Sequence, residues 1–463
     1  MKPSLRKTLA AAIVAGLALP SVSYATNGYF MIGFGAKSRG MGGVGVAEGV
    51  DGLAAAFNPA TMIDVGTRFD IGADLFYAPN TVSHSESAGL TDTIVIENSN
   101  FEDTGFSQNG IFLVPNMGGT YKYTDEITLG FAFIGAGMGT QYNQSITTGR
   151  GAGNNSYFFN FTGNGGDEKV GIKLLQMQIP LSIAYKLNDT HTVGASLSIA
   201  MQIFEAWGLG AFDALGFTST TGNLTNMGTD FSYGAGIRLG WQGKFLNNDL
   251  IVGANYSSRV YMTEFDDYKN LFAEQGDFDI PENYTVGIAY QAIPDLKIKF
   301  DIQQINYSDI ASVGNPGPLA TDPDEFNPLC PGADTPECQL GGDLGMGFGW
   351  TNQTIYKLGA EYQFSEKLDL RAGVNYGEAT IAPDQVLFNM LAPATVETHL
   401  TMGATYHWAD DIEISASYVH ALENTIVGPT TFQPVGSNPD ITVDNAAISM
   451  KQRALGVELG IKW

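Results

Sequence analysis

Basic residues are scarce in this sequence of 463 residues. It contains 23 lysines and arginines against 48 aspartates and glutamates, so the formal net charge at pH 7 is −25. Binding to nucleic acid through phosphate neutralisation needs a basic surface, so this class of partner is excluded. The acidic surplus can serve to keep loops solvated, and calcium binding in acidic loops is the alternative.

Histidine and cysteine are also scarce, which limits metal and catalytic chemistry. The five histidines are scattered, and none lies at the spacing of metal ligands. No serine or aspartate combines with a histidine into a set that could act as nucleophile, base and acid. The sequence therefore predicts no metal, no cofactor and no enzyme activity.

A glycine pattern of the form GxGxxG does occur, at residues 40–45. A dinucleotide site would need a strand before this pattern and a helix after it, within a βαβ unit. Neither element is predicted here, so the pattern does not indicate a nucleotide cofactor.

Long apolar runs are missing after residue 25, which excludes helical membrane proteins. Residues 1–25 have the three parts of a secretory signal: a basic start, an apolar run from Leu9 to Leu19, and small residues in Ser23-Tyr24-Ala25. The apolar run is shorter than the roughly 20 residues of a membrane helix. We therefore expect export, and a mature chain that begins near Thr26.

What the sequence does contain is alternation of apolar and polar residues with a period of two. It is clearest in residues 296–303, 368–376 and 454–463, where one face is apolar and the other is small or charged. These runs approach or reach the roughly 9–11 residues of a tilted membrane strand. Low charge (15%) and 57 glycines suit a barrel with an apolar outer face.

Short polar turns alternate with long loops along the chain. The turns lie at residues 124–126, 188–189, 247–249, 294–295, 365–367 and 409–411. Together with a strand from about Thr67 and a last strand ending at Trp463, they predict an all-β fold, a 14-stranded antiparallel transmembrane β-barrel. The barrel would occupy residues 67–463, with periplasmic turns and long extracellular loops.

Residues 26–66 lie outside the strand pattern. They are rich in glycine and alanine and too irregular for a strand, yet apolar enough to be ordered. A wide barrel needs its lumen filled. We therefore expect this segment to form an N-terminal hatch that plugs the lumen.

Two cysteines, Cys330 and Cys338, lie in a proline-containing stretch of an exported chain. Export places them in an oxidising compartment, so a disulfide that closes this loop is predicted. It would contribute roughly 2–3 kcal/mol.

Two motifs resemble the long-chain fatty acid transporter family of Gram-negative outer membranes, which also includes hydrocarbon and aromatic-compound channels. Residues Phe57, Asn58, Pro59 and Ala60, followed by Met62, look like the hatch motif of that family. The segment 114–117 (VPNM) looks like the motif of its second strand. The chain departs from the family at Thr61, where glycine is usual, and at the terminal Trp463, where phenylalanine is usual.

The resemblance implies a passive transporter in the outer membrane. A hydrophobic molecule is caught among extracellular loops and moves to a pocket in the lumen. The hatch then shifts, and an inward kink in the third strand lets the substrate leave sideways into the membrane. The expected partners are a hydrophobic substrate, outer-membrane lipid and lipopolysaccharide, and the barrel-assembly machinery, for a protein that is a monomer.

Glycines mark a candidate for this lateral opening. Gly135, Gly137 and Gly139 alternate within the predicted third strand, which starts at Ile127. Glycine inside a strand often marks a bend or bulge. The alternative is that these glycines only make room for the hatch.

Two predicted loops are unexpectedly apolar. Exposed apolar patches usually contact something, either a hydrophobic substrate or a neighbouring loop. The residues proposed for substrate capture are Leu209, Phe212, Leu215, Phe217, Phe265, Tyr268, Leu271 and Phe272.

Cations in the lumen could bind the carboxylate of a fatty acid. Alternation along the strands places five of them on the inner face: Arg238, Arg259, Lys299, Lys357 and Arg371. The alternative for each is pairing with a lumen carboxylate such as Asp301 or Glu361.

Three function classes are compatible with an exported barrel. The leading hypothesis is passive transport of long-chain fatty acids or hydrocarbons. A general porin for small polar solutes is the alternative, but an apolar plug would impede such solutes. A barrel enzyme, such as a lipase or protease, would need a catalytic set at one rim.

Overall fold

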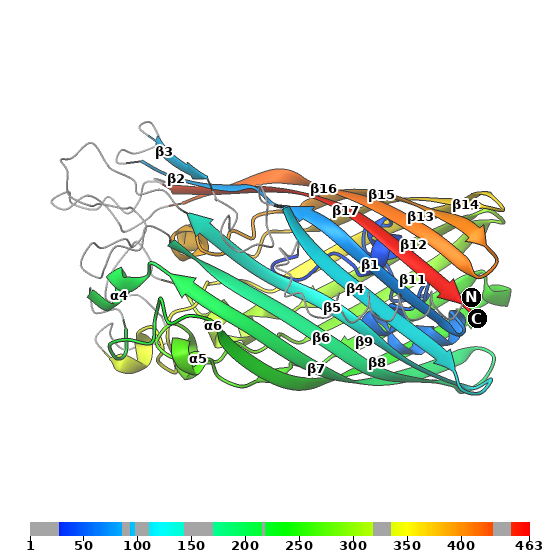
Figure 1. Ribbon diagram of the computed structural model, residues 1–463, viewed down its shortest axis with the longest axis horizontal. Helices are drawn as coiled ribbons and strands as arrows, with labels where there is room; N and C mark the ends of the chain where they lie inside the picture. Colours follow the sequence, from blue (N-terminus) through cyan, green and yellow to red (C-terminus); the bar gives the residue numbers. More distant parts are fainter. Residues whose placement is uncertain are drawn as a thin grey trace, which may run out of the picture.

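The computed structural model describes residues 27–85, 93–97, 111–142, 170–214, 218–317, 335–428 and 446–463. Strands dominate this part of the chain and wind around a closed cylinder (Figure 1). No helix among the described residues is both long and apolar enough to cross a membrane. The predicted signal segment, Leu215, Phe217 and Cys330 lie outside the described residues.

Seventeen strand segments make up the sheet. They are β1 (Arg68–Tyr77), β2 (Asn80–Ser85), β3 (Thr93–Glu97), β4 (Ile111–Lys122), β5 (Ile127–Tyr142), β6 (Val170–Lys186), β7 (His191–Trp207), β8 (Asp230–Phe245), β9 (Leu250–Ser257), β10 (Tyr261–Met262), β11 (Asn283–Ile293), β12 (Leu296–Ile305), β13 (Gln353–Ser365), β14 (Leu368–Gly377), β15 (Thr398–Ala409), β16 (Ile412–Gly428) and β17 (Ala446–Lys462).

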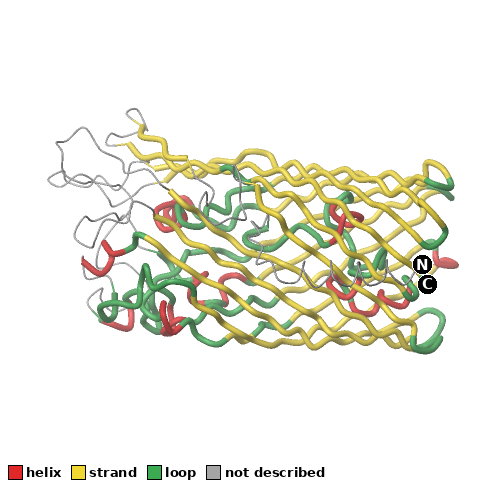
Figure 2. Tube along the Cα trace, in the orientation of Figure 1, coloured by secondary structure: helices red, strands yellow, loops and turns green. Residues whose placement is uncertain are grey.

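The helices are short and lie in the N-terminal segment, in the connections and at the rims (Figure 2). They are α2 (Gly35–Arg39), α3 (Ala54–Phe57), η1 (Pro59–Asp64), α4 (Gly210–Ala214), η3 (Leu246–Asn248), η4 (Asp266–Tyr268), α5 (Ala273–Gly276), η5 (Tyr307–Asp309), α6 (Ala311–Gly314), η6 (Pro336–Cys338), η7 (Pro383–Gln385) and α7 (Val386–Asn389).

The first and last strands close the barrel. β1 pairs antiparallel with β17 on one side and with β4 on the other, and the Trp463 amide donates to the Thr67 carbonyl at 3.1 Å. Three wall strands are interrupted, as β1/β2, β3/β4 and β9/β10, so seventeen segments form fourteen strands. This confirms the predicted fourteen-stranded antiparallel barrel, which closes within a single chain.

The wall has a lipid-facing side and a lumen side. In β17, Leu455 and Val457 are 50% and 53% exposed, whereas Gln452 and Glu458 are buried. Exposed aromatic residues form one girdle near the short turns: Tyr121, Tyr123, Tyr185, Tyr290, Tyr362, Phe364, Tyr406 and Trp408. A second girdle lies toward the long connections: Phe231, Tyr233, Tyr256, Tyr284, Tyr356 and Tyr376. Two such girdles are typical of outer-membrane barrels.

The N-terminal segment fills the lumen, as predicted for a hatch. Its short helices α2, α3 and η1 lie inside the ring of strands, toward the end where the C-terminus is marked (Figure 1). The η1 turn contacts β5, β6, β7 and β8, and α2 contacts β15, β16 and β17. Asn58 caps η1 by accepting from the Ala60 amide at 3.0 Å, and its own amide donates to the Trp241 carbonyl of the wall.

Glycines let the hatch backbone lie directly on the wall. A Cβ at Gly40 would lie 2.9 Å from Cα of Gly403 in β15, and a Cβ at Gly373 in β14 would overlap the Met41 backbone. A Cβ at Gly359 in β13 would lie 2.5 Å from the Met41 carbonyl oxygen. The glycine pattern at residues 40–45 therefore serves close packing against three wall strands.

We expect Gly373→Leu to push the hatch off this wall and to destabilise the barrel by about 1–3 kcal/mol, as overpacking does. The temperature of the heat-induced shift in gel mobility should fall, and protease should cut within residues 27–66. The control is Ala372→Leu, which adds a similar side chain on the exposed lipid side of the same strand. Equal behaviour of the two variants would contradict this account of how the hatch is seated.

Candidate functional site

The wall is broken between β4 and β5. Their ladder runs from Lys122 opposite Thr128 to Met117 opposite Phe133 and stops there. Beyond this point residues 111–116 of β4 pair with β1, and residues 134–142 of β5 pair with β6. Within the described ranges no ladder joins the two strands there. The structure thus places Gly135, Gly137 and Gly139 at a gap in the wall.

Beyond the gap, β5 turns away from the lipid. Leu129 near its start is 40% exposed, whereas residues 136–142 are buried on both faces. The Thr140 hydroxyl donates to the Leu391 carbonyl at 2.8 Å, and the Tyr142 hydroxyl donates to the Met390 carbonyl at 2.7 Å. Since residues 390–391 belong to the connection between β14 and β15, this half of β5 lies inside the barrel mouth.

Gly135 is not needed to make room for the hatch. A Cβ added to Gly135 would have its nearest neighbour, Val114 Cγ1 of β4, at an ordinary 3.8 Å. Lower in the same strand the opposite holds, because a Cβ at Gly130 would lie 2.5 Å from Met62 Sδ of the hatch. The Gly137 amide donates to the Tyr29 carbonyl at 3.4 Å, which brings the start of the hatch to the gap.

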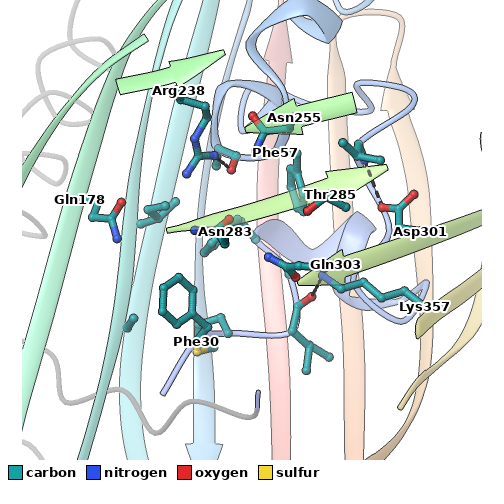
Figure 3. Close-up of a pocket in the computed structure, with 18 of the residues that line it drawn as sticks. Phe30, Phe57, Gln178, Arg238, Asn255, Asn283, Thr285, Asp301, Gln303 and Lys357 are labelled. Carbon is teal, nitrogen blue, oxygen red and sulfur yellow. Dashed lines mark hydrogen bonds between the residues drawn. The ribbon is translucent and has the colours of Figure 1, made fainter. Parts of the chain in front are cut away.

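A cavity of about 50 Å³ lies beside the gap (Figure 3). Its lining is two-sided. The hatch and β5 contribute apolar groups: Phe30, Ile32, Phe34, Phe57, Ile134, Gly135 and Ala136. The rest of the wall contributes polar groups: Gln176, Gln178, Arg238, Asn255, Asn283, Thr285, Asp301, Gln303 and Lys357. Such a lining suits a molecule with an apolar body and a polar end.

The structure separates the five candidate cations into two groups. Three of them have carboxylate partners: Lys299 with Glu48 at 2.7 Å, Arg371 with Glu361 at 2.6 Å, and Arg259 with Asp279 at 3.0 Å. For these three, pairing was the correct alternative.

Arg238 and Lys357 differ from the other three, because both are buried and line the cavity. Arg238 donates to the Ala56 carbonyl, and Lys357 donates to the carbonyls of Ile32 at 3.1 Å and Gly43 at 3.4 Å. Among the described residues, neither has a carboxylate oxygen within 4.0 Å.

The apolar loop residues form a buried core over the lumen, in contact with neighbouring loops and strands, which is one of the two alternatives that the sequence left open. Leu209, Phe212, Phe265, Tyr268, Leu271 and Phe272 are at most 4% exposed. We call the buried hydrophobic cluster that contains these six residues, together with Phe204 and Phe388, the loop core. The rings of Phe204 and Phe272 lie 4.7 Å apart, and Phe212 packs edge-on against Phe388 at 5.7 Å. In this conformation the partner of each loop is its neighbour.

The sequence analysis missed the aromatic residues that join the hatch to the loop core. Tyr29 is fully buried, and its ring centroid lies 5.5 Å from that of Tyr307 and 6.1 Å from that of Trp350. Phe30 packs on Tyr307 at 5.9 Å and also lines the cavity. The only signal was two adjacent aromatic residues at the start of the hatch.

Two loop groups have pKa values shifted by their surroundings. Burial raises the pKa of the Tyr268 phenol to about 12, and its hydroxyl donates to the Gly228 carbonyl at 2.5 Å. Burial and the neighbouring carboxylate of Asp279 raise the pKa of Asp277.

Cys338, in the same group of loops, is disulfide-bonded. Its expected partner Cys330 lies outside the described residues, so the pairing stays a prediction.

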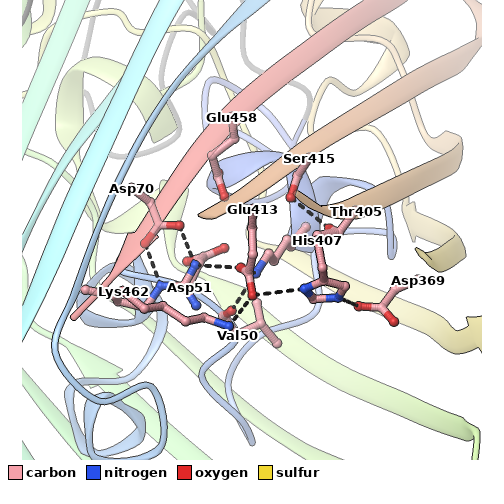
Figure 4. Close-up of polar contacts among 12 residues, drawn as sticks. Val50, Asp51, Asp70, Asp369, Thr405, His407, Glu413, Ser415, Glu458 and Lys462 are labelled. Atoms are coloured by element: carbon pink, nitrogen blue, oxygen red, sulfur yellow. Dashed lines mark hydrogen bonds and ion pairs between the residues drawn. The ribbon is translucent and has the colours of Figure 1, made fainter. Parts of the chain in front are cut away.

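A buried ionic cluster holds the hatch to the closure of the barrel (Figure 4). Glu413 of β16 accepts from Lys37 of the hatch at 2.5 Å, from Arg68 of β1 at 3.0 Å, and from Lys462 of β17. His407 of β15 lies 3.5 Å from the same carboxylate. One side chain thus connects the plug, the first strand and the last two strands.

A closed, plugged barrel with two aromatic girdles defines an outer-membrane protein of Gram-negative type. The chain belongs to the family described as outer membrane protein transport protein (OMPP1/FadL/TodX), whose sequence profile matches residues 32–451. This is a family of transport proteins. No curated protein matches the sequence.

Solved structures with the same fold include the Pseudomonas putida toluene transporter TodX, with 18% identity, a TM-score of 0.63, and coverage of 93% of this chain and 99% of that one. The Ralstonia pickettii toluene transporter TbuX has 20% identity, a TM-score of 0.61 and the same coverage. A Pseudomonas aeruginosa FadL homologue has 14% identity, a TM-score of 0.58, and coverage of 96% and 99%.

We expect Glu413→Gln to lower stability by about 3–5 kcal/mol, because it leaves buried cations without their counter-charge. The measurement is the urea or thermal midpoint of the gel-mobility shift. Glu423→Gln on the same strand is the control. Glu423 pairs with Lys451 at 3.2 Å, but both are about half exposed, so its loss should cost less than about 1 kcal/mol. A Glu413→Gln barrel as stable as the control would refute the anchoring role.

Proposed function

We propose that this protein passes hydrophobic molecules, either long-chain fatty acids or hydrocarbons, inward across the outer membrane without an energy source. The substrate is captured where the loops of the loop core part, binds at the lumen cavity once residues 27–31 move aside, and leaves sideways between β4 and β5. The observation that carries the proposal is the break in the ladder beyond Met117 and Phe133. Membership of a transport family supports it, as do similar folds whose names include toluene transporters.

The hydrophobic effect favours a sideways route. Each CH₂ group gains roughly 0.8 kcal/mol on leaving water. An exit through the periplasmic rim would forfeit this gain, whereas an exit into the bilayer keeps it. The direct route is also obstructed, because hatch residues pair with the wall: Lys37 with Glu413 at 2.5 Å, Arg39 with Asp74 at 2.5 Å, and Glu48 with Lys297 at 2.5 Å.

The ion pairs between hatch and wall limit how much of the hatch can move. The resemblance implied a hatch that shifts. Residues 32–66 carry the ion pairs and the glycine contacts, whereas residues 27–31 lie between the loop core and the cavity. In our proposal the movement is confined to residues 27–31 and the end of β5, while the anchored part stays in place.

An opening in lipid is tolerable only if its backbone groups find partners. Unsatisfied amides and carbonyls facing hydrocarbon are costly. Because β5 turns inward, its free edge faces the lumen, where the Gly137 amide already meets the Tyr29 carbonyl. The inward turn therefore makes a gap without exposing this edge to lipid.

A general porin is the second candidate, and the plug argues against it. The cavity of about 50 Å³ beside the gap has room for only a few waters. Single-channel conductance in a planar bilayer distinguishes the two functions, since an open porin conducts and a plugged barrel does not. Lipopolysaccharide and the assembly machinery remain expected partners.

Replacing Gly135 and Gly137 together with valine should favour a regular strand and close the gap. Gly135 has space for the added atoms. We expect uptake of a labelled hydrophobic substrate to fall severalfold, with folding and heat-modifiable mobility unchanged. The control is Leu129→Val, on the lipid-facing, fully paired part of the same strand. Uptake at the wild-type level in the folded double variant would disprove a lateral route at these glycines.

Arg238 and Lys357, which have no carboxylate oxygen within 4.0 Å in the described part of the chain, distinguish the possible substrates. Arg238→Met and Lys357→Met should each weaken binding of a long-chain fatty acid about tenfold, because a charge-assisted hydrogen bond is lost. Binding of an alkane of equal length should not change. Arg453→Met, at an exposed site, is the control. Equal losses for both ligands would show that these cations only hold the hatch.

A further inference from the structure

The second half of β5, residues 134–142, lies inside the barrel mouth, although a regular strand would seal the wall. If the ladder with β4 continued beyond Met117 and Phe133, Phe112 would lie opposite Met138. Such a ladder would also pair the backbone groups on the facing edges of both strands, and unpaired groups are costly in a membrane. Glycine permits a bend in a strand but does not impose one. The inward position therefore depends on contacts that hold it.

Two hydroxyl groups make contacts of this kind. Thr140 and Tyr142 are two residues apart, so their side chains lie on the same face of β5. The Thr140 hydroxyl donates to the Leu391 carbonyl at 2.8 Å, and the Tyr142 hydroxyl donates to the Met390 carbonyl at 2.7 Å. The Tyr142 hydroxyl also accepts from Asn80 Nδ2 of β2 at 3.1 Å. The end of β5 is thus bonded to two other parts of the mouth.

These hydrogen bonds are buried. Thr140, Tyr142, Met390 and Leu391 are each at most 2% exposed. Among the described residues, no backbone amide donates to the carbonyls of Met390 and Leu391. Because a buried carbonyl without a donor is costly, withdrawal of β5 from this position carries a free-energy penalty.

The two carbonyls belong to residues 383–395, which we call the mouth segment. This segment is anchored on β16 at both ends. A Cβ at Gly428 of β16 would overlap the Pro383 carbonyl oxygen, so the two backbones are in direct contact. At the other end, the Thr395 hydroxyl donates to the Asn424 carbonyl of β16 at 3.0 Å.

The middle of the mouth segment is fixed to the loop core. Asn389 is fully buried, and its Oδ1 accepts from Trp350 Nε1 at 2.5 Å. Its Nδ2 donates to the Phe348 carbonyl at 2.6 Å. Phe388, a residue of the loop core, stacks on Phe348 with ring centroids 5.0 Å apart. The mouth segment is therefore held by both β16 and the loop core, and it can in turn hold the end of β5.

We propose that Thr140 and Tyr142 are positioning residues for substrate exit, which bind the end of β5 to the mouth segment and so keep the gap beside β4 open. The role in exit rests on the proposed function, whereas the position of β5 can be measured separately. The glycines allow the strand to bend, and the two hydroxyls fix it in the bent position. Without the hydroxyls, the end of β5 returns to the wall, pairs with β4 and closes the gap.

A pair of cysteines reports whether β5 has returned to the wall. In a continued ladder, Phe112→Cys and Met138→Cys would lie opposite each other, with Cα atoms about 4.5–5.5 Å apart and within disulfide range. In the structure, Phe112 and Met138 belong to separate hydrophobic clusters. The intact barrel with this pair is the reference. Mass spectrometry of an unreduced digest gives the yield of the crosslink after mild oxidation.

Thr140→Val combined with Tyr142→Phe removes both hydroxyls and nearly preserves the shape of the two side chains. We expect the crosslink yield to rise about tenfold, because two buried hydrogen bonds are lost. Uptake of a labelled hydrophobic substrate should fall severalfold in the same variant without the cysteines. Thr140→Ser keeps a hydroxyl and should behave like the reference. Thr128→Val combined with Tyr185→Phe is the matched control, since both residues lie in the fully paired part of β5 and β6.

A crosslink yield at the reference level in the folded double variant would overturn the proposal, as would an equal rise in the control. An equal rise in Thr140→Ser would also overturn it, because the hydroxyl would then not be the group that matters. A higher yield with undiminished uptake would confirm how β5 is positioned and would refute the lateral route, so the two proposals can fail separately. If the double variant does not fold, Thr140→Val and Tyr142→Phe are measured singly by the same crosslink.

Discussion

Backbone amides and carbonyls cannot face hydrocarbon without partners, and the rest of this structure depends on that constraint. Because of this constraint, β1 must pair with β17 to close the barrel. A break in the ladder is possible only where the unpaired backbone groups of the strand edge form other hydrogen bonds. At β5 the edge turns into the lumen and meets Tyr29. At β13 and β14 the wall rejoins through Trp350 and Ile381, beyond the girdle. The two irregularities thus satisfy the same constraint on backbone groups in different ways.

Charge in the lumen follows a second constraint, because a buried ion must be paired or hydrogen-bonded. Most lumen ions satisfy it by joining hatch to wall, as Glu413 does with Lys37 and Arg68. The anchored part of the plug is therefore held by the same side chains that line the barrel. Arg238 and Lys357 hydrogen-bond to backbone carbonyls and lie beside the gap, and Lys357 is opposite Asp301 in the ladder of β12 and β13.

Much of the fold could be predicted from local pattern. Alternation fixes which residues face lipid, and polar turns such as residues 188–189 mark the rim, so the fourteen strands and the start of β5 at Ile127 were correct. For Phe265 and Phe272 the sequence left two alternatives open, contact with a substrate or with a neighbouring loop. The sequence of an apolar loop is the same whether the loop contacts a substrate or another loop. The contacts that decide the matter, such as that of Phe212 with Phe388, join residues far apart in the sequence.

The sequence by itself determined the class of molecule: an exported chain, a closed barrel of alternating strands, and a segment that could only fill it. Local periodicity suffices for this because each strand needs the same two faces wherever it lies in the wall. Only the tertiary structure decided which glycines the hatch packs against and which lumen cations form ion pairs with carboxylates. Gly135 and Gly130 look alike in the sequence, but a Cβ at Gly135 would make only ordinary contacts with the wall, whereas a Cβ at Gly130 would overlap Met62 of the hatch. Alternation along the strands places both Arg371 and Arg238 on the lumen face. Only the folded barrel shows that Glu361 lies within ion-pair distance of Arg371 and not of Arg238.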